Sequence, residues 1–255
     1  MLRYTAEGSQ LALRVSAGLS RYSPHPARFP NRHTPDTSLN PQHTFIQMTA
    51  PAQSTPITVT THNQYEAKTS LTPADVRTSP LDQFRDWFLE AQNNPNVLEP
   101  EALSLSTATP SGVPSSRMVL LKQVDDRGFK IYTNYTSRKS QELKTNPHAA
   151  LNFYWRELHR QVRVVGRAEM VTHEDSEEYF RSRPTGSQIG AWASRQSSIV
   201  DENEVTKRFS LLEQRFGVED GRGSVPMPEF WGGWRIVPEY VCISQTQALL
   251  LTATA

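Results

Sequence analysis

Basic and hydroxyl side chains gather where two predicted strands end and a predicted helix begins. Arg117 and Lys122 bracket the segment RMVLLK, Tyr132-Thr133 ends the next strand, and Ser137-Arg138-Lys139 opens a short helical segment. A helix N-terminus offers free backbone N–H groups, and together with a hydroxyl and several cations it suits a phosphate. The same residues could form a solvated basic patch, because such clusters are common on protein surfaces. The pattern therefore allows a phosphate site without requiring one.

Gln161 marks a second candidate site, because it opens the segment QVRVVG, which is apolar at alternate positions. A buried amide side chain can both donate and accept hydrogen bonds, and this suits the edge of a flavin ring. A polar residue at the start of a strand can equally face water. Both interpretations stay open on these residues alone.

Tyr179, Arg183 and Ser187 form a third candidate site. Tyr179 and Arg183 are four residues apart, so they share one face of a predicted helix. Pro184 ends that helix, and Ser187 follows in the expected loop. A phenol, a guanidinium and a hydroxyl together suit a second anion. The alternative is ordinary helix capping beside an exposed arginine.

Helical spacing of apolar residues marks four segments that must help to position these side chains. Ser79 suits an N-cap and Pro80 the first turn of the first helix, which should end at 93–95. Gly217 is the expected stop of the last one. The predicted helices cover residues 79–93, 138–144, 172–183 and 205–216.

Alternation of apolar and polar residues predicts several strands joined by short turns. The segments Pro110-Ser111-Gly112 and 125–128 have turn composition. Short connections of this kind favour an antiparallel sheet or a small barrel, so the predicted fold class is mainly antiparallel β with peripheral helices. The predicted strands cover residues 102–107, 117–123, 129–133, 149–155 and 161–171.

The bulk composition excludes several classes of protein. The chain has 255 residues, which fits one domain with tails, and its net charge of +1 gives no reason to expect nucleic acid or a membrane surface as partner. Its only cysteine, Cys242, rules out an intrachain disulfide and favours a reducing compartment. The seven histidines show no spacing typical of metal ligands. No apolar run is long enough to span a bilayer.

Residues 1–75 differ from the rest, because they are rich in Ser, Thr, Pro and Gln and should bury too little apolar surface to fold. We expect them to form a disordered extension. No acidic residue occurs from 8 to 35, while arginines recur, and this composition is typical of a mitochondrial transit segment. An ordinary tail is an equal alternative. Because Met48 offers a second start, the expected location is cytoplasmic or mitochondrial.

Five motifs between about Pro80 and Tyr240, in one order and spacing, resemble the pyridoxamine 5′-phosphate oxidase family. Each motif alone would be weak, but the set is highly specific and extends over roughly two thirds of the chain. The motifs are SSRMVLLK (115–122), YTNYTSRK (132–139), LHRQVRVVG (158–166), YFRSRPTGSQIGAWASRQSS (179–198) and PEFWGGWRIVP (228–238).

The resemblance implies an FMN-binding split β-barrel that works as a homodimer with FMN at the subunit interface. The implied contacts of the cofactor are Arg117, Met118, Val119, Leu120, Leu121, Lys122, Tyr132, Thr133, Arg138, Lys139, Gln161, Gln196 and Ser197. The implied contacts of the substrate, mainly with its phosphate, are Lys122, Tyr179, Arg183 and Ser187.

The implied reaction belongs to vitamin B6 metabolism. It oxidises pyridoxamine or pyridoxine 5′-phosphate at the 4′ carbon to pyridoxal 5′-phosphate, with hydride transfer to the flavin and release of hydrogen peroxide from dioxygen. Because the cofactor carries the redox chemistry, no catalytic side chain and no metal are expected.

The resemblance ends after Val241. The family continues there with a hairpin that carries a flavin-contacting tryptophan, an Arg-Leu-His element and a further arginine, and residues 242–255 contain none of these. We therefore expect an oxidase domain over 76–241, a non-family tail over 242–255, and an unpaired strand edge where the last hairpin is missing. The absent side chains also leave open a non-catalytic module that binds flavin or pyridoxal phosphate.

Overall fold

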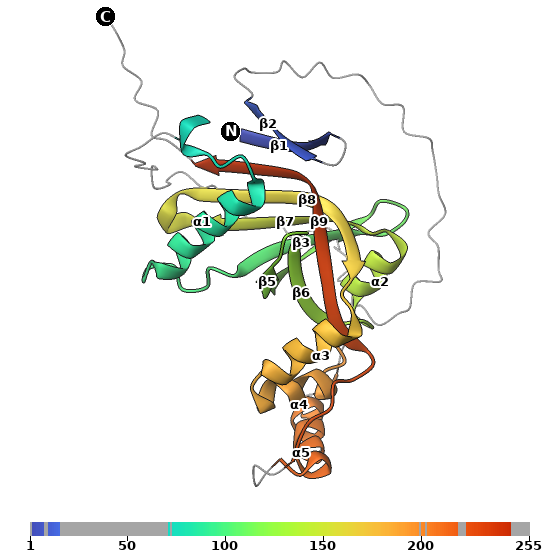
Figure 1. The fold of residues 1–255 in the computed structure, drawn as a ribbon. Coiled ribbons are helices and arrows are strands. Elements are labelled where there is room, and N and C mark those ends of the chain that lie inside the picture. The colour runs from blue at the N-terminus through green and yellow to red at the C-terminus, as the bar shows by residue number, and fades with distance from the viewer. Residues whose placement is uncertain are drawn as a thin grey trace, which may run out of the picture.

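The computed structural model describes residues 2–7, 10–15, 71, 73–198, 200–201, 203–218 and 223–245, which form a curled sheet with helices around it (Figure 1). The strands are β1 Leu2–Glu7, β2 Gln10–Val15, β3 Ala102–Ala108, β4 Pro114–Leu120, β5 Gln123–Val124, β6 Phe129–Asn134, β7 His148–Trp155, β8 Arg160–Met170 and β9 Trp231–Gln245. The helices are α1 Pro80–Asn93, α2 Arg138–Thr145, α3 His173–Ser182, α4 Thr185–Ala193 and α5 Glu204–Phe216, with single turns η1 Pro73–Asp75 and η2 Arg156–Leu158.

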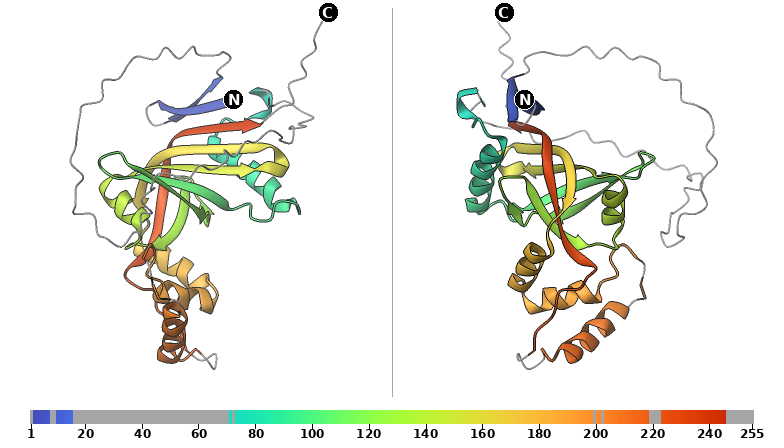
Figure 2. Two further views of the ribbon diagram at one scale, coloured as in Figure 1. Left: turned by 180° about the vertical axis from the view of Figure 1, so that it is seen from behind. Right: turned by 45° about the vertical axis from the view of Figure 1, so that its right-hand side comes forward.

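All pairings between the described strands are antiparallel, in the order β2-β1-β9-β8-β7-β3-β4, and β6 pairs with both β9 and β5. Strand β5 follows β4 almost directly in the chain. Because β4 pairs with β3 whereas β5 pairs with β6, the sheet curls back toward itself here. The predicted antiparallel class is confirmed. Helices α3, α4 and α5 project below the sheet, at the end away from β1 and β2 (Figures 1 and 2).

Capping residues in the sequence predicted most helix ends correctly. Ser79 caps α1, because its Oγ accepts a hydrogen bond from the backbone N–H of Asp82 at 3.3 Å. Gly217 ends α5 with a φ of 61°, the left-handed conformation that favours glycine. The loop expected after Pro184 is wrong, because Pro184 is itself the N-cap residue of α4 and Ser187 lies in the first turn of that helix.

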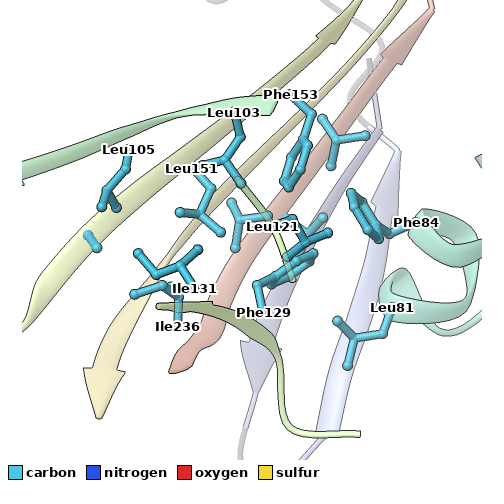
Figure 3. Packing of buried hydrophobic residues seen from close by; sticks show 14 of the residues in the cluster. Leu81, Phe84, Leu103, Leu105, Leu121, Phe129, Ile131, Leu151, Phe153 and Ile236 are labelled. Carbon is cyan, nitrogen blue, oxygen red and sulfur yellow. The ribbon is translucent and has the colours of Figure 1, made fainter. Parts of the chain in front are cut away.

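The core fills the concave side of the sheet. Strand β3 turns Leu103 and Leu105 inward between partly exposed polar neighbours, which is the alternation that its sequence predicts. Helix α1 adds Phe84, whose ring meets that of Phe129 edge-on at 4.9 Å between centroids. Figure 3 shows these side chains pointing toward one another from α1, β3, β6 and their neighbours.

Strand β9 continues beyond the point where the family resemblance ends. It includes residues 242–245, and Ile243 is fully buried in the core. Along 240–243 its edge pairs with β1, so this stretch is not the free edge that the sequence predicts. Strands β1 and β2 also lie inside the range 1–75, for which the sequence predicts no regular structure.

Two other expectations fall partly outside the described residues. The possible transit segment extends through positions 16–47, and the possible tail through 246–255, of which the structure describes nothing. Among the described residues, no helix combines the length and the apolar character that crossing a bilayer requires.

The end of β9 generates a stability prediction. Replacing Ile243 with alanine should lower the free energy of unfolding by about 2–5 kcal/mol, because it leaves a cavity in the core. Ser244→Ala, on the neighbouring half-buried position, is the matched control and should change it little. Urea unfolding measures both variants. Equal stability of Ile243→Ala and the parent chain would show that residues beyond Val241 do not belong to the core.

Candidate functional site

A cavity of about 460 Å³ opens between β4, β6, the start of α2, α3 and α4, and we call it the central cavity. It brings together most of the residues that the sequence assigns to cofactor and substrate. The predicted residues that line it are Arg117, Met118, Val119, Leu120, Lys122, Tyr132, Thr133, Lys139, Tyr179, Arg183, Ser187 and Gln196.

A second cavity of about 640 Å³, the adjacent cavity, shares Asn134, Ser194 and Gln196 with the central one. Arg138 and Ser197 line it, and the Oγ of Ser197 accepts a hydrogen bond from the backbone N–H of Arg138 at 3.3 Å. These two predicted cofactor residues therefore lie at the border of the central cavity, at the N-terminus of α2.

Two predicted residues line neither cavity. Leu121 is buried in the core, because the alternation along β4 and the next residues turns it inward. Gln161 lies on β8, where its Nε2 donates a hydrogen bond to Oδ1 of Asn152 at 2.8 Å.

Gln161 shares a sheet face with Met118. Directly opposed residues in an antiparallel sheet lie on the same face; Asn152 is opposed to Ser104, and Ser104 to Met118. This outer face also carries Tyr154, which is opposed to Gln161. Met118 is 67% exposed and Tyr154 is 51% exposed, so the outer face presents large apolar groups.

The α2 end of the central cavity is rich in hydrogen-bond donors. Nζ of Lys139 donates to Oε1 of Gln196 at 3.0 Å, and Oγ1 of Thr133 donates to the same oxygen at 2.7 Å. Burial, with a contribution from the charge of Arg117, lowers the pKa of Lys139 from 10.5 to about 8. Ser137, the N-cap residue of α2, makes no capping hydrogen bond, and its buried Oγ has no hydrogen-bond partner among the described residues. Unused donors beside partly desolvated cations suit an anion such as a phosphate.

The α3 end of the central cavity holds a cation among aromatic rings. The guanidinium carbon of Arg183 lies 4.9 Å from the ring centroid of Trp231, and its buried Nη1 has no hydrogen-bond partner within the described chain. Burial lowers the pKa of this guanidinium. A ring face attracts a cation but leaves its N–H groups unsatisfied. An incoming anion would satisfy them.

Trp231 is a site residue that the sequence analysis did not single out. Its ring forms a cluster of three nearly parallel rings with Tyr132 and Tyr179, at centroid distances of 5.6 Å from Tyr132 to Trp231, 4.0 Å from Tyr132 to Tyr179 and 6.2 Å from Tyr179 to Trp231. Burial is the main reason that the pKa of Tyr132 rises to about 12, so its hydroxyl stays protonated at neutral pH. The only feature of the sequence that could have indicated this role of Trp231 is the motif FWGGW, because its two glycines leave room for the neighbouring rings.

Both glycines of that motif are needed for close approach. A side chain on Gly232 would overlap the hydroxyl of Tyr135, and one on Gly233 would lie 2.8 Å from the ring of Tyr132. The strand therefore passes directly beneath both tyrosines.

Comparisons with known proteins agree on one family. A sequence model described as pyridoxamine 5′-phosphate oxidase matches residues 89–216. A protein named probable pyridoxamine 5′-phosphate oxidase from Schizosaccharomyces pombe is 49% identical over 178 residues, which cover 69% of this chain and 77% of that protein. A pyridoxine/pyridoxamine 5′-phosphate oxidase from Rubrobacter xylanophilus is 53% identical over 163 residues, or 64% and 73% of the two chains.

Solved structures agree with the fold. PhzG from Burkholderia lata 383, in complex with tetrahydrophenazine-1-carboxylic acid, matches with a TM-score of 0.64 and 29% identity, covering 70% of this chain and 86% of that one. An FMN-binding protein from Nostoc punctiforme, related to pyridoxamine 5′-phosphate oxidase, matches with a TM-score of 0.51 and 13% identity, covering 65% and 83%. The predicted split-barrel fold is confirmed.

The lowered pKa of Lys139 generates a pH prediction. Sulfate keeps both charges between about pH 6.5 and 9.5, whereas Lys139 loses its charge as the pH rises through about 8. Stabilisation by sulfate, measured as the rise in thermal midpoint, should therefore weaken above that pH. A bound anion raises the pKa, so the loss should move to higher pH as sulfate increases. Lys139→Arg should bind sulfate equally well throughout. A parent chain whose response does not change with pH would contradict the assignment.

Proposed function

This chain belongs to the pyridoxamine 5′-phosphate oxidase family, and from that premise we propose how its residues perform the family's reaction. It is an oxidoreductase and flavoprotein that converts pyridoxamine or pyridoxine 5′-phosphate to pyridoxal 5′-phosphate, with FMN as cofactor and dioxygen as acceptor, and releases hydrogen peroxide. The observation that carries the assignment of roles is the central cavity, which has one set of anion-binding groups at each end.

The α2 end fits the phosphate of FMN. Arg117 and Lys139 line the central cavity there, and Arg138 and Ser197 stand at its border. The pKa of Lys139 is lowered by burial, and a phosphate dianion would restore its charge. The first N–H groups of α2 add neutral donors.

The α3 end fits the phosphate of the substrate. Arg183 supplies a guanidinium with an unused N–H group, Tyr179 a phenol and Ser187 a hydroxyl in the first turn of α4. The two ends belong to one cavity, so a ligand at each end would bring a ring of the substrate near the flavin. When bound, FMN supplies the hydride acceptor and the route of electrons to dioxygen.

The protein's own part in the reaction is to bind and to orient. Val119 presents apolar surface to the cavity, and the stacked rings of Tyr132 and Trp231 close its wall. Such walls restrict how a flat ligand can lie, and correct placement accounts for much of the rate in reactions of this kind. Since Tyr132 stays protonated, it acts as a donor rather than as a base at neutral pH.

We also propose that the chain works as a homodimer through the outer sheet face. Met118, Leu120 and Tyr154 are exposed apolar residues on that face, as expected of a surface that a partner covers. Gln161 lies on the same face and lines neither cavity of its own chain. A dimer would let it reach the partner's cofactor. The proposed compartment is the cytoplasm or the mitochondrion, on the composition of the N-terminal segment.

Turnover tests the function directly. The purified chain with added FMN should release hydrogen peroxide when it is given pyridoxamine 5′-phosphate, and should form pyridoxal 5′-phosphate in equal amount. Binding of FMN without any turnover would support the alternative of a non-catalytic module. Release of FAD instead of FMN on denaturation would contradict the cofactor assignment.

Arg183→Ala tests the division of the cavity. Loss of a charge-assisted hydrogen bond costs about 1.5–3 kcal/mol, so KM for the substrate should rise about 10–100-fold while the flavin content stays unchanged. Arg181→Ala is the matched control, because Arg181 lies on the same helix, is 73% exposed and pairs with Glu177. Loss of flavin with an unchanged KM would show that the two phosphate ends are exchanged.

A further inference from the structure

One carboxylate lies behind the cations of the α2 end. Glu142 is on α2, and its side chain is only 6% exposed. Its Oε1 accepts a hydrogen bond from Nε of Arg138 at 2.9 Å. Its Oε2 accepts one from Oγ of Ser115 at 2.6 Å and another from Oγ1 of Thr107. A buried acid beside a phosphate site is unexpected, because it repels the phosphate.

Arg117 reaches the same carboxylate through the two hydroxyls. Its Nη1 donates to Oγ1 of Thr107 at 2.6 Å, and its Nη2 donates to Oγ of Ser115 at 2.5 Å. A hydroxyl has one proton, and a carboxylate can only accept, so both protons point to Glu142. The lone pairs of both hydroxyls therefore face Arg117. The direct distance from Nη2 of Arg117 to Oε2 of Glu142 is 3.6 Å.

The network keeps Glu142 ionised. Burial acts to raise the pKa of Glu142, but the hydrogen bonds from Ser115, Thr107 and Arg138 outweigh it and hold the pKa below its usual value. The carboxylate thus stays a pure acceptor at neutral pH. Every bond described above depends on that state, because a protonated acid or an amide must donate on one side.

The arginines keep donors for a ligand. Arg138 meets Glu142 through Nε, and this ion pair does not use its terminal nitrogens. Arg117 donates hydrogen bonds to Thr107, Ser115 and the carbonyl oxygen of Leu105, and it still lines the central cavity. Without an acid between them, two neighbouring guanidinium groups would repel each other and turn toward water.

We propose that Glu142 is a positioning residue, which holds Arg117 and Arg138 in the orientation that binds the cofactor phosphate before the cofactor arrives. The proposal rests on the function proposed above. It assigns to Glu142 no contact with the ligand. The gain is pre-organisation: two long side chains are ordered at folding rather than at binding, so binding loses less side-chain entropy.

Riboflavin makes the test specific, because it has the ring of FMN and lacks the phosphate. Quenching of flavin fluorescence on titration with the flavin-free full-length protein gives Kd for both ligands. Glu142→Ala should raise Kd for FMN about 10-fold or more, since it disorders donors worth about 1.5–3 kcal/mol each. Kd for riboflavin should stay within about twofold.

Two further variants sharpen the comparison. The amide of Glu142→Gln can accept hydrogen bonds only through its oxygen. It should therefore keep either the hydrogen bonds from Ser115 and Thr107 or the one from Arg138, and give an intermediate Kd for FMN. Glu99→Gln removes the same charge from an exposed loop residue and should leave both constants unchanged.

Each other result has a definite meaning. An unchanged or lower Kd for FMN in Glu142→Ala would overturn the proposal and show that Glu142 only competes with the phosphate. An equal loss of FMN and riboflavin, or failure of both Glu142 variants to fold, would overturn it in favour of a general structural role. A parent chain that binds riboflavin as tightly as FMN would instead refute the phosphate site itself, and with it the proposed cofactor role.

Discussion

Strand β9 hydrogen-bonds to β8 along one edge and to β6 along part of the other, and both ends of the central cavity depend on this double pairing. β6 carries Tyr132 and Thr133 and leads into α2, whereas β8 leads into α3, which carries Tyr179 and is followed directly by Arg183. Helix α3 is also tied to the strand, because Oγ of Ser176 accepts the backbone N–H of Gly233 at 3.2 Å. Residues about 50 positions apart therefore meet through one strand that orders both of its neighbours.

The two ends of the cavity stabilise buried positive charge in different ways. At the α2 end, the carboxylate of Glu142 and two hydroxyls surround the guanidinium groups, so opposite charge offsets part of the desolvation cost. At the α3 end, Arg183 meets the faces of Phe180 and Trp231, which attract it more weakly and satisfy none of its N–H groups. An anion at the α3 end would therefore satisfy a buried N–H group of Arg183 that has no partner within the described chain, whereas one at the α2 end would meet cations that already have partners.

Local patterns in the sequence predicted the parts of the fold that depend on near neighbours. Ser79, the alternation in β3 and Gly217 are of this kind, and so is the basic cluster at the start of α2. Glu142 could not be found in this way, because its partners Thr107 and Ser115 are on two strands that come earlier in the chain. The sequence does not predict helix α4, because a proline such as Pro184 ends the preceding helix, and here the next helix begins at the following residue.

The place of Gln161 shows a different limit. Sequence spacing gives the face of a strand only relative to its neighbours, and the pairing of β8 with β7 turns Gln161 to the outer face. A role at the cofactor then depends on a second copy of the chain, which a single sequence does not reveal.

The glycine pair beneath Tyr135 and Tyr132 also constrains how such a site can evolve. Neither Gly232 nor Gly233 can acquire a side chain while these rings stay in place. At Gly233 a path of single substitutions must therefore first reduce both Tyr132 and Val171, and Tyr132 belongs to the stack with Tyr179 and Trp231. The intermediate would lose part of the aromatic wall of the central cavity before anything replaced it. Gly233 and the aromatic stack should thus be inherited as one unit, and Gly232 should be inherited with Tyr135.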